Sequence, residues 1–320
     1  MDVRDRLTRW ALQRPHVLLV AAPVGTTLRW RVETELGRRR WPAASSPADA
    51  DILLTLAQIG DLDDAADVLW GQVPPPRLRV HIDSGDDISR VLDDAARALS
   101  ERPAREPAEP RPLDAGDGDG DIAGLPMAGG GPDRDGMELD ALTVHLGPVL
   151  PGWPAGLVVS ATLQGDVMTD VGARVLGPTV GDPRPDPTLV ALDALERVLI
   201  VSGWTAAARE AARLRGVLAG DGPPTADAVR RVRALVGAVR RSRALGWSLR
   251  DLRGTDERVQ RWCDVVEQGA AGRPGAAVLP AYVPMTDVPE LLDGLDVGSA
   301  RIAVAALPLA LTSRDRAAQS

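Results

Sequence analysis

The chain of 320 residues contains no phenylalanine, lysine or asparagine, and only one cysteine. A single thiol, Cys263, excludes an internal disulfide framework and any zinc or iron–sulfur site that needs several thiolates from this chain. With one tyrosine and no phenylalanine, eight tryptophans must supply nearly all of the aromatic bulk of a core. This skewed composition is typical of a GC-rich genome, such as that of an actinobacterium.

Acidic residues outnumber basic ones, so the formal net charge is −8 and the sequence pI is about 5.1. This balance makes a surface-wide attraction to nucleic acid or anionic lipid unlikely. No apolar run approaches the roughly 20 residues of a membrane span, and the first residues lack the apolar core of a signal peptide. We therefore expect a cytoplasmic protein that is either soluble or attached to the inner face of the cell membrane only through partners.

The first hundred residues alternate between strand and helix patterns. Apolar runs typical of strands occur at 16–22, 52–57 and 78–82. Helical periodicity follows each of these runs. Because this order implies parallel strands joined by right-handed crossovers, we predict a flavodoxin-like parallel sheet in an α/β domain over 1–100.

Residues 101–136 are rich in Pro, Gly and Asp and poor in large apolar side chains, which predicts a disordered linker. Within it, the run 114–121 alternates Asp and Gly as a calcium loop does. It lacks the glycine in sixth place and the distal glutamate of such loops. A solvated linker is therefore favoured over a calcium site.

A second domain, over 137–320, is predicted to be α+β. Alternating apolar residues on both sides of a Gln-Gly-Asp turn indicate a β-hairpin over 139–177. Helical patterns fill 188–270, with a break near Gly203, and a terminal helix and strand are predicted over 289–311. The predicted domain thus combines a β-hairpin sheet with a helical bundle.

The most informative stretch is 145–176, which reads as a strand, a loop and a returning strand pair. The glycine and proline residues that mark its loop are Gly147, Pro148, Pro151 and Gly156. The stretch resembles the opening hairpin of the large catalytic subunit of respiratory complex I and of membrane-bound nickel–iron hydrogenases. That family has Gln-His-Pro and a second histidine before a glycine. Here Leu150 replaces the first histidine, and Pro154 or Ala155 replaces the second. The resemblance therefore implies that the hairpin is kept but lacks the histidines that serve the family's chemistry.

The first domain resembles the partner small subunit, which carries the iron–sulfur cluster nearest the active site. The resemblance covers 16–82, and its best part is the strand Asp-Ile-Leu-Leu-Thr at 51–55, followed by a helix and the sequence Gln-Val-Pro-Pro-Pro at 72–76. The loops in which the family places cysteines contain none here. At the other end, 295–307 is similar to the final strand of the large subunit.

The resemblance implies a fused subunit pair without cofactors. We expect a redox-inactive structural, assembly or regulatory component related to NADH:quinone oxidoreductase or energy-converting hydrogenase, with partners among such subunits and not catalytic by itself. One alternative is a quinone-side subunit of a complex I-like oxidoreductase that retains partial activity. Another is a binding module that uses an Arg-rich helix for an acidic partner or, less in keeping with the net charge, nucleic acid.

Three side chains are candidates for chemistry. His145 flanks the hairpin loop and could be a displaced quinone or proton group, although a strand-end histidine bonded to the backbone is the simpler interpretation. Tyr282, the only tyrosine, could take the place of the tyrosine that contacts the quinone in complex I. Cys263 shares a helix face with Val259 and Trp262, which favours a buried small hydrophobe over a reactive thiol.

Two further features allow binding. The segment 230–253 is rich in arginine and carries an apolar stripe, which fits nucleic-acid binding, an acidic partner, or a solvated face that pairs with the chain's own acids. Gly25, Thr26 and Thr27 lie between a predicted strand and helix, where an anion can bind. They lack the lysine of a P-loop and a full glycine fingerprint.

Overall fold

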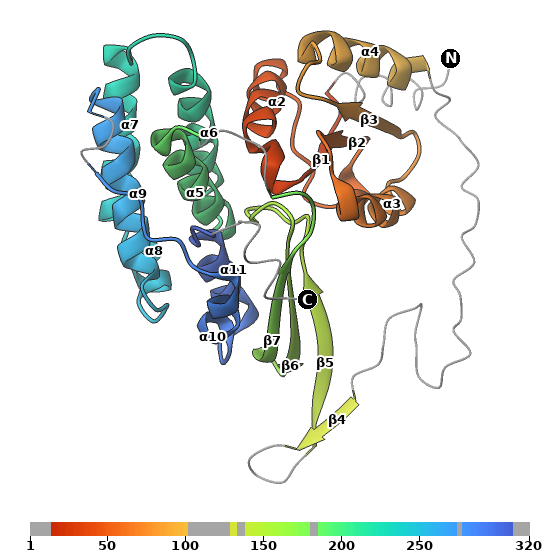
Figure 1. Cartoon of the computed structure of the whole chain (residues 1–320), viewed down its shortest axis with the longest axis vertical. Coiled ribbons are helices and arrows are strands. Elements are labelled where there is room, and N and C mark those ends of the chain that lie inside the picture. The colour runs from red at the N-terminus through yellow and green to blue at the C-terminus, as the bar shows by residue number, and fades with distance from the viewer. Residues whose placement is uncertain (1–13, 102–128, 133–137, 180–184, 274–276, 310–320) are drawn as a thin grey trace.

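The computed structural model describes residues 14–101, 129–132, 138–179, 185–273 and 277–309. Figure 1 shows an α/β unit beside a helical bundle, with a long antiparallel sheet extending below them. The calcium-like run 114–121 and most of the predicted linker lie outside the described residues. The coarse prediction of a parallel α/β unit and a separate antiparallel sheet with helices is confirmed.

The α/β unit is built on three parallel strands, β1 (Val17–Ala21), β2 (Ile52–Leu56) and β3 (Leu78–Ile82). Every residue of β2 is buried because β2 lies between the other two strands and is covered on both faces. Helices α2 (Thr26–Arg39) and α4 (Ile88–Glu101) pack on the face of Leu54, and α3 (Asp63–Gln72) packs on the face of Leu53.

The strand order corrects the sequence prediction. A flavodoxin-like sheet places its first strand between the second and third. The order here is β1-β2-β3, so the flavodoxin-like part of the prediction is wrong for these strands. Helices α2 and α3 cover opposite faces of the sheet, while β2 and β3 are each added on the same side of the preceding strand. The crossover connections β1-α2-β2 and β2-α3-β3 therefore have opposite handedness. Both faces of the buried β2 are covered in this arrangement, and α4 shares the face of α2.

The antiparallel sheet contains β4 (Gly129–Pro132), β5 (Glu138–Leu146), β6 (Leu157–Gln164) and β7 (Val167–Val175), in that order. The predicted hairpin over 139–177 is confirmed. Strand β4 falls inside the segment predicted as a linker. A run of glycines carries no side-chain pattern, so its pairing with β5 leaves no signal in the sequence.

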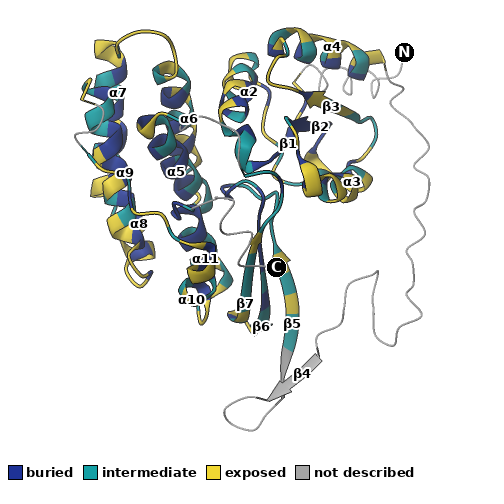
Figure 2. Cartoon of the chain, viewed as in Figure 1, coloured by how far each residue is buried: buried dark blue, intermediate teal, exposed yellow. Residues whose placement is uncertain are grey.

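The bundle contains five consecutive helices: α5 (Pro187–Val201), α6 (Thr205–Leu218), α7 (Ala226–Arg241), α8 (Arg243–Leu249) and α9 (Thr255–Ala270). The predicted break is confirmed at Gly203, whose φ is +75°. Helix α5 lies in the middle of the bundle and is buried over most of its length, whereas exposed residues mark the outer sides of α7 and α9 (Figure 2). A Cβ atom on Gly269 of α9 would lie 2.0 Å from Thr188 Oγ1, so this glycine allows α9 to approach α5 closely.

Two short helices end the described chain, α10 (Val288–Leu292) and α11 (Val297–Ala305). The prediction of a terminal strand is therefore wrong over 297–305, which is helical, and Leu309 forms an isolated bridge with Val283. Asp296 caps α11 by accepting from the Ser299 N–H at 2.9 Å, and Ala300, Ala303 and Val304 bury one helical face. Within the described residues, none of the helices has both the length and the apolar character to cross a bilayer.

Candidate functional site

The hairpin loop, residues 147–156 between β5 and β6, is a packed junction. Three of its glycines have positive φ and lie where no side chain fits. A Cβ atom would lie 2.1 Å from Leu157 O at Gly147, 2.6 Å from Val201 Cγ2 at Gly152, and 2.2 Å from Leu176 O at Gly156. These glycines therefore allow the loop to pack closely against its surroundings, because they have no side chains to clash.

The loop packs against both halves of the molecule. Val149 and Leu176 pack against the apolar cluster around α3, and a Cβ atom on Gly156 would lie 3.2 Å from Pro23 Cδ. Leu150, at the position of the family's first histidine, packs half-buried against the core of the bundle. Pro148 and Pro151 are also half-buried. An apolar side chain thus fills the position at which the resemblance calls for a ligand-binding histidine.

The two catalytic candidates lie on different surfaces. His145 is exposed on β5 opposite Ser160, and it shares its side of the strand with the exposed Thr143. Tyr282 is 61% exposed on the rim of a surface groove of about 440 Å³ between α9 and α10. No described contact joins His145 to Tyr282, so the described structure does not bring them together.

The predicted anion site is largely used by the backbone. The Gly25 N–H donates to Ala22 O at 2.9 Å, and the Thr26 hydroxyl donates to Pro23 O at 2.7 Å. Thr27 follows in the first turn of α2. The Gly25 N–H and the Thr26 hydroxyl are therefore already engaged by backbone carbonyls of the preceding turn.

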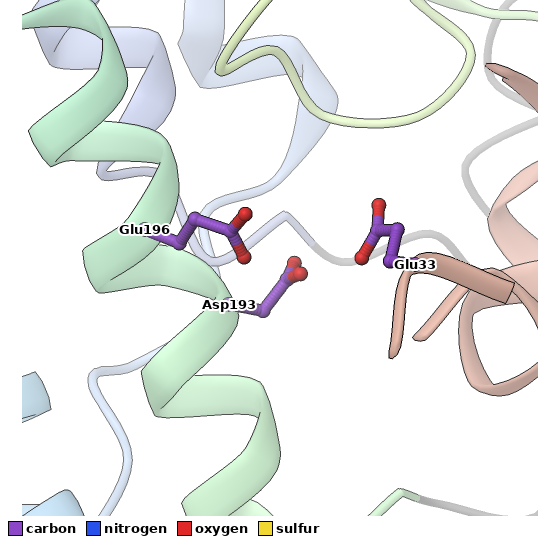
Figure 3. Close-up of side chains that lie close together, drawn as sticks. All are labelled: Glu33, Asp193 and Glu196. Carbon is purple, nitrogen blue, oxygen red and sulfur yellow. The ribbon is translucent and has the colours of Figure 1, made fainter. Parts of the chain in front are cut away.

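A site that sequence analysis missed lies between the two halves. We call it the junction cluster: Arg29 and Glu33 of α2, Asp193 and Glu196 of α5, and Arg215 of α6. Figure 3 shows the carboxylates of Asp193 and Glu196 on one side and that of Glu33 on the other. The Arg215 side chain is 1% exposed and that of Asp193 is 9% exposed. The centre of the cluster is therefore largely shielded from solvent, while the side chains of Arg29, Glu33 and Glu196 are partly exposed.

Asp193 is the centre of the cluster. Its Oδ1 atom accepts from Arg29 Nη2 at 2.8 Å, from Trp30 Nε1 at 2.8 Å and from Arg215 Nη1 at 2.9 Å. Two of these donors come from residues more than 160 positions away in the chain. A buried carboxylate needs such partners because burying it alone would cost several kcal/mol.

Arg215 joins three carboxylates. It pairs with Asp193, with Glu196 and, through its other terminal nitrogen, with Glu33. Arg29 completes the contacts by pairing with Glu33 at 2.7 Å. Gly216, next to Arg215, brings α6 close to α2, since a Cβ atom there would lie 2.8 Å from Thr34 Oγ1.

The surroundings of Glu196 and Asp193 on α5 shift the pKa values of these two acids in opposite directions. Burial raises the pKa of Glu196 to about 7, and the charges of Glu33 and Asp193 act in the same direction against Arg215. Burial would also raise the pKa of Asp193, but the nearby charges of Arg29 and Arg215 hold that pKa well below its usual range. Near neutral pH, Glu196 is therefore the one of these two acids that exchanges a proton.

Three carboxylates of the cluster have oxygen atoms within 4.8 Å of one another, which is a spacing that suits a metal ion. Two guanidinium groups already lie between them and pair with all three. A cation would have to displace Arg215 or Arg29 from buried ion pairs. The donor set is therefore already satisfied by the chain's own cations.

A further buried cation lies beside the cluster. Arg197 follows Glu196 on α5, and its buried Nε atom, like that of Arg215, has no hydrogen-bond partner among the described residues. Burial lowers its pKa. Its carbonyl oxygen lies against the hairpin loop, 2.8 Å from the position of a Cβ atom on Gly152. The cluster thus adjoins the loop that the resemblance singles out.

The remaining candidates from the sequence are the Arg-rich segment 230–253 and Cys263, and both have contacts within the molecule. Arg231 pairs with Glu210 at 2.8 Å and Arg240 with Glu267 at 2.9 Å, so much of the Arg-rich segment pairs with the chain's own acids. Cys263 is fully buried in α9, and burial raises its pKa to about 12. An inert buried thiol, as predicted, is consistent with this environment.

Comparison with family models, with curated proteins and with solved structures finds no match to this chain.

Proposed function

We propose that this chain is a redox-inactive structural or assembly component related to the catalytic subunit pair of complex I-like oxidoreductases and energy-converting hydrogenases. It would act in the cytoplasm, at the inner face of the cell membrane, through partner subunits. The proposal rests on the sequence resemblance and on how the two halves meet.

The order of structural units supports this proposal. An α/β unit comes first, a β-hairpin follows, and a helical bundle ends the chain. This is the order expected of a small subunit fused to a large one. In such a fusion, the surfaces that separate subunits would bury against each other become an interface within one molecule.

The observation that carries the proposal is the junction cluster. It lies between α2 of the first half and α5 and α6 of the second, and it contains three acids paired with Arg29 and Arg215. Beside it, the hairpin loop carries Leu150 where the family has a histidine. Buried ion pairs at this boundary favour fixed geometry over substrate entry. Nothing in the positions of His145 and Tyr282 favours the quinone-side alternative.

The proposal is tested on the full chain, tagged and recovered from its native membranes under mild detergent. Mass spectrometry of the recovered material should detect membrane-arm or other complex I-like subunits. Iron and acid-labile sulfide, measured on the purified chain, should be absent at stoichiometric levels, because one buried thiol cannot ligate a cluster.

His145→Ala is the control variant, since an exposed side chain on β5 should not affect recovery of a structural partner. Stoichiometric iron and sulfide in the purified chain would show that the component is not redox-inactive. Recovery of the chain without any such subunit would contradict the assembly role.

A further inference from the structure

Helix α8 presents an outer face that the rest of the molecule does not cover. The helix has seven residues and is anchored by Leu245 and Leu249, which are buried in the core of the bundle. Its remaining residues are exposed or half-buried. Trp247, which points away from this anchor, is 72% exposed, the largest exposed fraction of any tryptophan in the described chain.

Two arginines flank this tryptophan at helical spacing. Arg243 lies four residues before Trp247 and Arg250 three residues after it, so all three share one side of the helix. Both arginines are exposed, and neither forms an ion pair with a carboxylate among the described residues. We call Arg243, Trp247 and Arg250 the α8 face.

The neighbours of the α8 face make it accessible. Ala244, Gly246 and Ser248 are exposed and small, so a partner backbone can approach the indole ring without a clash. Asp251 is the nearest exposed acid in the sequence, and it makes no described ion pair with Arg250 or Arg243. By contrast, Arg230 and Arg240 of α7 are both engaged by acids of the bundle.

We propose that the α8 face is a docking site for an acidic protein segment, whose carboxylates pair with Arg243 and Arg250 while an apolar side chain covers Trp247. Tryptophan and arginine are enriched among the residues that dominate binding energy at protein interfaces. Guanidinium groups that lack an internal partner can pair bidentately with carboxylates. The inference uses none of the residues that carry the proposed function and does not depend on it.

The charge of the chain favours a short acidic segment over nucleic acid. The whole chain has a formal net charge of −8, so a long polyanion would be repelled beyond the face itself. A short segment interacts only with charges within about one Debye length, roughly 8 Å at physiological salt. That range covers little more than the α8 face.

Fluorescence anisotropy with the full chain and a labelled peptide of alternating Glu and Leu residues tests the proposal. Binding at low salt should weaken as the salt concentration rises. Trp247→Ala and the double variant R243Q/R250Q should each weaken binding about tenfold or more. The double variant R230Q/R240Q is the matched control, because it also removes two positive charges, which Asp227, Asp264 and Glu267 already pair, and it should bind as the unmodified chain does.

Any of four results would overturn the proposal. The unmodified chain fails to bind the peptide at low salt, or both α8 variants bind it as the unmodified chain does. Duplex DNA or single-stranded DNA competes for the face more tightly than the peptide. The chain forms dimers that the α8 variants abolish, which would make a second copy the occupant. Circular dichroism of each variant confirms that α8 substitutions leave the fold intact.

Discussion

Arg215 of α6 donates from Nη1 to Oδ1 of Asp193 on α5 over 2.9 Å, and only 1% of its side chain is exposed. The same guanidinium group reaches Glu33 of α2, so one side chain connects the helical bundle to the α/β unit. An ion pair this deeply buried adds little net stability when intact, because desolvation offsets the attraction. Its loss, however, removes the described ion-pair partner of Glu196 and leaves Glu33 and Asp193 to share Arg29.

Replacing Arg215 by methionine should therefore destabilise the fold by about 3 to 5 kcal/mol, since the shape is nearly kept while Glu33, Asp193 and Glu196 lose their shared partner. Urea unfolding followed by circular dichroism measures this change. Arg213→Met is the control on the same helix. Its side chain is 68% exposed and 3.8 Å from Glu210, so its effect should stay within about 0.5 kcal/mol. Equal effects of the two substitutions would contradict the role of the cluster.

The raised pKa of Glu196 predicts a pH dependence of stability. Between its ordinary value of 4.5 and its folded value of about 7, the folded chain holds a proton on Glu196 that the unfolded chain releases. This group's contribution is therefore present in full below pH 4.5 and is lost as the pH rises through 7. Glu196→Gln removes that loss.

The free energy of unfolding of the unmodified chain should fall by about 2 kcal/mol relative to Glu196→Gln between about pH 5 and about pH 8. Urea titrations at a series of pH values provide the comparison. Glu257→Gln, at a side chain that is 67% exposed, should give a curve parallel to that of the unmodified chain. A difference between the Glu196→Gln and unmodified curves that does not change with pH would show that Glu196 keeps its charge on folding.

The hairpin loop should not tolerate a side chain at Gly156. Gly156→Ala combines a φ of +74° with a Cβ atom 2.2 Å from Leu176 O, so we expect a loss above about 3 kcal/mol. Gly165→Ala separates the two causes, since its φ is +65° and no atom lies within 4 Å of the added Cβ. That variant should lose only about 1 to 2 kcal/mol. Thermal unfolding compares them, and similar losses would mean that the loop can move to accept the methyl group.

Cys263 should resist thiol reagents in the folded chain. Burial raises its pKa to about 12, and the side chain is fully buried in α9. Reaction with a disulfide reagent should therefore be slow in buffer and fast in denaturant. A fast reaction in buffer, with the fold intact, would indicate that α9 opens locally.

The elements that sequence analysis predicted well are those with a strong local pattern. The apolar run at 52–57 gave a buried strand, and the break at Gly203 separated two helices. The terminal segment was misjudged because apolar residues such as Val304 and Leu307 suit a strand or a buried helix equally. Only the cap at Asp296 distinguishes them, and it was not recognised.

The junction cluster was missed for a different reason. Its hydrogen-bonded members are separated by up to 182 residues, and no spacing rule connects them. One local signal was present: Asp193 and Glu196 lie in a helix whose other residues are mostly apolar. Acids in such a helix indicate a buried cation elsewhere, but only the fold identifies Arg29 and Arg215 as their partners.

The covalent connection between two halves that share buried charges has a consequence for the cell. A pair of separate subunits comes apart on dilution, and each orphan would expose Asp193 or Arg29 without its counterpart. Within one polypeptide the local concentration of each half near the other is fixed by the tether, so their pairing does not depend on expression level. Production of the two halves in equal amounts is thereby guaranteed by translation itself.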